Sequence, residues 1–244
     1  MRLGKGRWRL LTLLAVLTAG CDPPGKPTEA DRPVPADKVT DFDTLYKERC
    51  AGCHGAQGKL GPAPPLNDPL FLAIVPADQL QNVVSKGRAV TPDQKTPMPA
   101  FARAHGGPLT DDQVKALAKG LKDHWGSAES ASGAPPYLGG KGGDSEEGRR
   151  VFARACAGCH GKQGEGVEQD GKLRRKINDR AFLALISDQA LRRVIITGRP
   201  DLGMPAYDGT DERPADFQPL KSAQIDDLVA LLASWRKGKP AAEK

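Results

Sequence analysis

The sequence reads Leu45-Tyr-Lys-Glu-Arg-Cys-Ala-Gly-Cys-His-Gly55 in its first half and Val151-Phe-Ala-Arg-Ala-Cys-Ala-Gly-Cys-His-Gly161 in its second. The similarity continues further along both halves: Asn67–Ala73 matches Asn178–Ala184, and Leu80–Arg88 matches Leu191–Arg199. Self-similarity of this kind marks a duplicated structural unit. The 244 residues therefore indicate two related domains of roughly 100 residues each.

Each repeat contains two cysteines with two residues between them and a histidine directly after the second cysteine. These residues are Cys50, Cys53 and His54 in the first repeat and Cys156, Cys159 and His160 in the second. Two thiols at this spacing can form thioethers to the two vinyl groups of one porphyrin, and the adjoining histidine can bind its iron. A thioredoxin-like redox pair would follow a strand, and a zinc site would need its cysteine pairs much closer together. The motifs therefore predict two covalently bound haem c groups.

Few residues could serve as the second axial ligand of each iron, because the chain has three methionines and four histidines. Met98 and Met204 each precede a proline and occupy matched positions in the two halves. His160 is the only histidine of the second half, which leaves Met204 as the candidate there. In the first half His105 follows closely and could compete with Met98. We expect His54 with Met98 and His160 with Met204.

The composition suggests that protein side chains alone would fill the two cores poorly. Aromatic residues make up 5% of the chain, while it contains 28 glycines and 21 prolines. Small domains depend on large apolar groups for a stable core. A porphyrin in each domain would supply this apolar surface and couple haem binding to folding.

The net charge of +6 does not indicate a nucleic-acid partner. Four of the basic residues, Arg2, Lys5, Arg7 and Arg9, lie in an N-terminal segment without acidic residues. Basic and acidic residues are interspersed in the remainder, which therefore lacks the basic face that nucleic-acid binding requires.

Where the sequence pattern predicts secondary structure it predicts helices, and the expected fold is all-α. The clearest helix begins at Thr110, because Thr110 and Gln113 fit a capping box and apolar residues follow on one face. Its counterpart carries Ile225, Leu228 and Leu232 on one stripe. Further helices are expected over 79–86 and 189–197. No segment alternates apolar and polar residues long enough to predict a sheet.

The N-terminus has the features of an export signal: a basic segment ends at Arg9, and an apolar run spans Leu10–Val16. The stretch Leu17-Thr-Ala-Gly-Cys21 resembles the lipobox of bacterial lipoproteins, although Thr18 stands where that family prefers an apolar residue. The resemblance implies lipidation of Cys21 and an anchor on the periplasmic side of a bacterial membrane. Ordinary signal cleavage would instead leave a soluble periplasmic protein.

Segments rich in proline, glycine and serine divide the chain. The expected organisation is a signal peptide at 1–20, a Pro-rich tether at 21–40, a domain at 41–126, a flexible Gly/Ser/Pro linker at 127–143, a second domain at 144–238 and a tail at 239–244. The composition of the linker is typical of a flexible connection.

Each half resembles a class I cytochrome c domain, over Asp41–Trp125 and Asp144–Lys237. The resemblance implies that an aromatic residue before the haem motif meets a tryptophan of the last helix. Tyr46 with Trp125 and Phe152 with Trp235 occupy these positions, but the two tryptophans are displaced by one residue relative to the repeat. One of the two helix crossings should therefore differ. The resemblance also implies that Gly61-Pro62 supports the first haem histidine, and the second repeat lacks this proline.

The function expected from these features is single-electron transfer by a dihaem cytochrome c. Neutral histidine and thioether ligands favour ferrous iron, so the potentials should be high, and the unequal surroundings of the two haems should make them distinct. The expected partners are redox proteins, such as a quinol-oxidising complex, a terminal oxidase or a periplasmic reductase. The alternatives are a dihaem peroxidase or other haem enzyme, and an electron-transfer subunit of a larger oxidoreductase complex.

Overall fold

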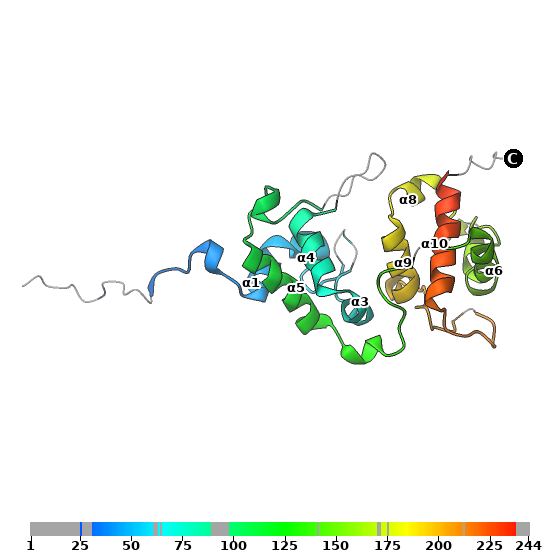
Figure 1. Ribbon diagram of the computed structural model, residues 1–244, viewed down its shortest axis with the longest axis horizontal. Coiled ribbons are helices and arrows are strands. Elements are labelled where there is room, and N and C mark those ends of the chain that lie inside the picture. The colour runs from blue at the N-terminus through cyan, green and yellow to red at the C-terminus, as the bar shows by residue number, and fades with distance from the viewer. Residues whose placement is uncertain are drawn as a thin grey trace, which may run out of the picture. The chain divides into compact units, whose positions relative to one another are not determined.

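The computed structural model (Figure 1) describes residues 25, 31–60, 63, 65–88, 98–140, 142–169, 172–174, 176–211 and 213–237. The chain separates into two units, Met1–Ala36 and Asp37–Lys244, and both repeats lie in the second. The expected signal peptide, Cys21 and the tail lie outside the described residues. Within the described ranges, no helix combines the length and the apolar character that crossing a bilayer requires.

The second unit is built from two similar series of helices. The first repeat contains α1 (Phe42–Arg49), α2 (Ala51–His54), α3 (Pro69–Ile74), α4 (Ala77–Lys86) and α5 (Asp111–Trp125). The second contains α6 (Ser145–Ala155), α7 (Ala157–His160), α8 (Arg180–Ala184), α9 (Asp188–Thr197) and α10 (Ser222–Lys237). Short 3-10 turns span Ala36–Lys38, Arg103–His105, Ala128–Ala131 and Pro200–Leu202. The all-α expectation is confirmed for both repeats.

One small element departs from the helical pattern. Among the described residues, the only strands are β1 (Val167–Gln169) and β2 (Lys172–Arg174), which pair antiparallel. They lie between His160 and Asn178, a stretch that is longer than the matching one between His54 and Asn67 of the first repeat. The additional length of this loop is thus used for a hairpin.

Side chains at fixed positions start the helices. Asp41 caps α1 and Asp144 caps α6, and in each case the carboxylate accepts a hydrogen bond from a backbone N–H of the first turn. At α5 the expected capping box is present: the Gln113 N–H donates to the Thr110 hydroxyl, and the Thr110 N–H donates to Gln113 Oε1. Local sequence therefore fixes where both outer helices of the first repeat begin.

The first and last helices of each repeat cross at a glycine, but different helices supply it. In the first repeat Gly120 of α5 faces the Phe42 ring of α1, which would lie 2.2 Å from a Cβ at position 120. In the second repeat Gly148 of α6 faces α10, and a Cβ there would lie 2.1 Å from the backbone oxygen of Asp227. Helices α6 and α10 (Figure 1) therefore approach backbone to backbone, whereas a phenyl ring separates α1 from α5.

The aromatic pairs of the two repeats nevertheless have nearly the same geometry. The ring centroids of Tyr46 and Trp125 are 5.0 Å apart at an interplanar angle of 81°. Those of Phe152 and Trp235 are 5.2 Å apart at 80°. The one-residue displacement of the tryptophans is thus accommodated, and the two crossings differ in their glycine contacts.

Each repeat has a separate buried core. The first core centres on Leu72, Leu117 and Ala118, and the second on Leu183, Ile196 and Ile225. These residues come from the third and later helices of their repeat. The helices that follow each haem motif in the chain therefore form the core of that repeat.

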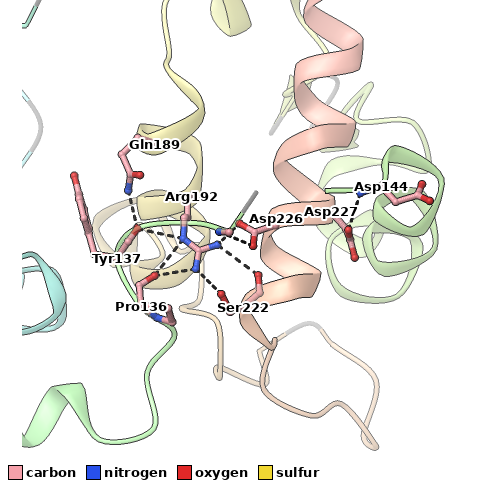
Figure 2. A network of polar contacts seen from close by, with 9 residues as sticks. Pro136, Tyr137, Asp144, Gln189, Arg192, Ser222, Asp226 and Asp227 are labelled. Carbon is pink, nitrogen blue, oxygen red and sulfur yellow. Dashed lines mark hydrogen bonds and ion pairs between the residues drawn. The ribbon is translucent and has the colours of Figure 1, made fainter. Parts of the chain in front are cut away.

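Part of the segment expected to be a flexible linker is hydrogen-bonded to the second repeat. The guanidinium of Arg192 on α9 donates to the backbone oxygens of Pro136 and Tyr137 (Figure 2). Arg192 also pairs with Asp226 of α10 at 2.6 Å and donates to the Ser222 hydroxyl at 2.8 Å. The Arg192 side chain is only 3% exposed. This buried network differs from the expectation of a free linker. The carbonyls of Pro136 and Tyr137, which belong to the linker, accept hydrogen bonds from the buried guanidinium.

The two repeats also touch each other within the second unit. The guanidinium carbon of Arg193 on α9 lies 3.5 Å from the ring centroid of Phe71 on α3, and Arg193 donates to the Pro65 carbonyl at 2.7 Å. Leu70 and Ile74 of α3 pack against the second core. Burial lowers the pKa of Arg193 to about 10. Helix α9 therefore contacts both the linker and the first repeat.

The contact at Gly148 leads to a stability prediction. Gly148→Ala should lower the free energy of unfolding by about 1–3 kcal/mol, because the new methyl group collides with backbone that cannot rotate away. Guanidinium denaturation of the haem-loaded protein, followed by circular dichroism, measures this. Arg149→Ala, on the exposed face of α6, is the control. Equal stability of Gly148→Ala and the control would contradict the close crossing.

The Arg192 network leads to a prediction about the linker. Arg192→Ala removes the donors to Pro136 and Tyr137, so chymotrypsin should cleave after Tyr137 several-fold faster than in the unaltered protein. Arg150→Ala, whose side chain is exposed on α6, is the matched control. The cleavage rate is measured by mass spectrometry. Equal cleavage of all three proteins would mean that the linker is already free.

Candidate haem sites

In the second repeat, the four residues expected to hold haem lie around one cavity. Cys156, Cys159, His160 and Met204 all line a space of about 350 Å³. Most of its remaining wall is apolar and includes Phe152, Leu183, Leu191, Ile195, Leu228 and Leu232. A cavity of this size lies in the range of ligand pockets. Thiol, imidazole and thioether groups around an apolar space match the donor set of a haem c site.

The cysteines of this cavity follow directly from α6. The Cys156 N–H donates to the Phe152 carbonyl at 2.9 Å, and the His160 N–H donates to the Cys156 carbonyl at 3.0 Å. The short helix α7 thus places Cys156 and Cys159 one turn apart. Gly161 ends it with φ of 79°, where a side chain would be strained. The motif is therefore rigidly attached to the helix that crosses α10.

Burial keeps the first cysteine of each motif neutral in the haem-free chain. Burial raises the pKa of the Cys156 thiol to about 12 and that of the Cys50 thiol to about 11. Zinc ligation, thiol redox chemistry and thioether formation all use the thiolate, so this shift does not separate the alternatives. In the described part of the chain no three His, Cys, Asp or Glu side chains gather as a metal site. The Met204 thioether and the apolar cavity wall, which neither a zinc site nor a redox thiol pair uses, favour haem.

The backbone next to Met204 is held against the end of α9. The Arg199 N–H donates to the Met204 carbonyl at 2.9 Å, and the Met204 N–H donates to the Arg199 carbonyl at 3.0 Å. Gly198, with φ of +67°, allows this approach, because a Cβ there would lie 2.5 Å from the Met204 oxygen. Met204 is thereby fixed at the cavity by two backbone hydrogen bonds and one glycine.

The first repeat has the same backbone arrangement around its motif and its methionine. The His54 N–H donates to the Cys50 carbonyl at 2.9 Å, and the Arg88 N–H donates to the Met98 carbonyl at 3.3 Å. A Cβ on Gly87 would lie 2.5 Å from the Met98 oxygen. The two methionine segments thus share the glycine contact and one backbone hydrogen bond, and the second repeat adds the bond from the Met204 N–H. Gly61-Pro62, the expected support of the first haem histidine, lies outside the described residues.

His105, the competitor of Met98, lies on an exposed turn. It ends the 3-10 turn Arg103–His105, and its backbone N–H donates to the Ala102 carbonyl. Its side chain belongs to an exposed residue, whereas Met98 is half-buried. This difference in burial favours Met98 as the residue that faces a haem.

An arginine in the second cavity is missed by the sequence reasoning. Arg213 lines the cavity and donates to the carbonyls of Ala155, Ala206 and Gly209. Its guanidinium carbon lies 4.4 Å from the Phe217 ring centroid. The segment between the methionine and the last helix is longer in the second repeat than in the first. In the sequence, this added length is the feature that points to the segment containing Arg213.

Known proteins resemble the chain in both repeats. The family model described as cytochrome c matches residues 145–236, and the one described as cytochrome c oxidase, cbb3-type, subunit III matches residues 37–119. The cbb3-type cytochrome c oxidase subunit FixP of Bradyrhizobium diazoefficiens is 30% identical over 171 residues, which are 68% of this chain and 53% of that protein. Subunit FixPc of Rhizobium leguminosarum bv. viciae is 30% identical over 170 residues, with the same coverage. The chain thus spans about half the length of these curated relatives.

The chain therefore consists of two cytochrome c domains in tandem and carries two covalently bound haem c groups. Haem supplies one-electron chemistry at its iron. The chain attaches it, surrounds it with apolar side chains and limits the access of water. Cytochrome c domains are typical of electron carriers, and this pair is related to subunit III of the cbb3 oxidases.

Removal of both thiols in one motif tests the dependence of folding on haem. The Cys156→Ala, Cys159→Ala variant should carry one covalent haem per chain instead of two and lose helical content in the second domain, because its apolar cavity would lose the group that fills it. Haem content and circular dichroism measure both effects. The equivalent Cys50→Ala, Cys53→Ala variant should have the same effects in the first domain, and Arg149→Ala, exposed on α6, is the control that should keep both haems and full helicity. Full helicity with one haem would show that the second core is stable without its cofactor.

Proposed function

We propose that this chain is a dihaem carrier of single electrons that serves a terminal oxidase of the cbb3 type, as a free donor or as a subunit. The observation that carries the proposal is the cavity lined by Cys156, Cys159, His160 and Met204. The names of the relatives support the choice of partner, since both are cbb3-type oxidase subunits.

The proposed axial pairs are His54 with Met98 and His160 with Met204. Both pairs are neutral, which favours the ferrous state and gives high potentials suited to a donor of an oxidase. Two such ligands also leave the iron without an open position. A haem enzyme that acts on peroxide needs such a position, together with a distal acid or base.

The proposed location is the periplasmic face of a bacterial membrane. Residues 1–20 would direct export, and Cys21 would carry a lipid that holds the mature chain at the membrane surface. The Pro-rich segment after Cys21 would then separate the haem domains from the lipid headgroups. A donor tethered in this way stays near a membrane-bound oxidase at high effective concentration.

The test combines spectroscopy with electron transfer. The ferric protein should show the charge-transfer band of a methionine sulfur bound to iron, and neither haem should bind cyanide rapidly. Met204→Ala should lose the band from one haem, bind cyanide there, and donate electrons to membranes containing a cbb3 oxidase at least about tenfold more slowly, because its potential falls.

His105→Ala is the matched control and should behave like the unaltered protein in all three measurements. An unaltered protein that lacks the sulfur band, or that binds cyanide or peroxide at one haem, would overturn the carrier proposal. A gain of the sulfur band in His105→Ala, or rapid cyanide binding at its first haem, would overturn the Met98 assignment.

A further inference from the structure

We infer that Arg213 is a positioned charge that raises the reduction potential of the second haem above that of the first. The inference rests on the proposed function and adds a direction to it, because it makes the second domain the stronger electron acceptor. Arg213 lies on the wall of the cavity that also contains Cys156, Cys159, His160 and Met204.

The guanidinium is fixed in place by neutral groups. It donates to the carbonyls of Ala206 at 2.9 Å, Gly209 at 2.5 Å and Ala155 at 3.3 Å, and it stacks on the Phe217 ring. Across the described residues, no carboxylate lies within ion-pair distance of Arg213. Carbonyls and an aromatic ring orient the group without cancelling its charge.

The other charged groups of the cavity wall do not replace Arg213. Arg199 pairs with Asp201 at 2.7 Å, so its charge is compensated. Asp211 also lines the cavity, and it and Asp208 both attract the guanidinium of Arg213. Both carboxylates belong to exposed residues, so water weakens their effect and they offset only part of the arginine charge. Arg213 is half-buried, and its guanidinium is held by the carbonyls of residues that are half-buried as well. Among the described residues of this wall, Arg213 is therefore the cation without a carboxylate at ion-pair distance.

The sign of the effect follows from charge balance. Oxidation of a haem removes one electron and leaves one more positive charge on the iron, while reduction restores the electron. A nearby positive charge in a poorly screened site disfavours the oxidised form more than the reduced form. The potential of the second haem is therefore raised. The corresponding segment of the first repeat, residues 98–110, has Arg103 and His105 only at exposed positions, so within these residues no half-buried cation takes the place of Arg213.

The experiment is a spectroelectrochemical titration of the haem-loaded full chain. In Arg213→Gln one of the two potentials should fall by at least about 59 mV, which corresponds to a tenfold change in a one-electron equilibrium constant. The sulfur–iron band should remain, which separates this outcome from a failure of the ligand assignment. Arg213→Lys keeps the charge and should retain most of the original potential. Arg149→Gln, exposed on α6, should leave both potentials unchanged.

A variant at the exposed Asp211 keeps the inference testable if Arg213→Gln does not assemble. Asp211→Asn removes a negative charge from the same wall and should raise the same potential. Equal potentials in Arg213→Gln and the Arg149→Gln control, or equal falls in Arg213→Gln and Arg213→Lys, would overturn the inference. Absence of a rise in Asp211→Asn would also overturn it, because the haem would then be insensitive to charge on this wall.

Discussion

The close crossing of α6 and α10 is the constraint on which the second haem site depends. The haem motif continues directly from α6, and α10 supplies Leu228 and Leu232 to the opposite part of the cavity lining. Their separation is set where Gly148 meets the backbone of Asp227. A side chain at that point would shift the thiols relative to the apolar wall. The width of the cavity thus depends on a contact whose residues, Gly148 and Asp227, do not line it.

In the two domains, different helices supply the glycine at which the first and last helices cross. A phenyl ring on α1 fills the space above Gly120 in the first domain, while the glycine lies on the N-terminal helix in the second. Both arrangements bring an aromatic ring to within about 5 Å of a tryptophan. Ring geometry is therefore kept although helix separation differs. The two haem sites consequently differ in how their first and last helices pack together.

Much of this architecture could be predicted from the sequence, because its signals are local. The duplicated haem motif, the capping box at Thr110 and the apolar stripe of α10 each depend on residues a few positions apart. The roles of Arg192 and Arg213 could not be predicted in this way. Both donate mainly to backbone carbonyls, which every residue possesses and which leave no mark in a sequence.

The linker illustrates the same limit. Glycine, serine and proline correctly indicate a segment without regular structure, but composition does not reveal whether a distant side chain holds it. Arg192 is far from Pro136 in sequence and reaches it only because α9 passes there. The hairpin β1–β2 and the segment with Arg213 likewise lie in loops that are longer in the second repeat. The lengths of these loops can be counted in the sequence, but their contacts cannot be predicted from it.

The buried thiols bear on the timing of maturation. Bond formation to a porphyrin vinyl group uses sulfur as the nucleophile, and the thiolate is far more reactive than the thiol. Once α6 and α10 have closed, a Cys156 with a pKa near 12 is almost entirely protonated at neutral pH. The folded chain is then a poor substrate for attachment. Attachment before α6 and α10 close would meet a more exposed and more reactive thiol.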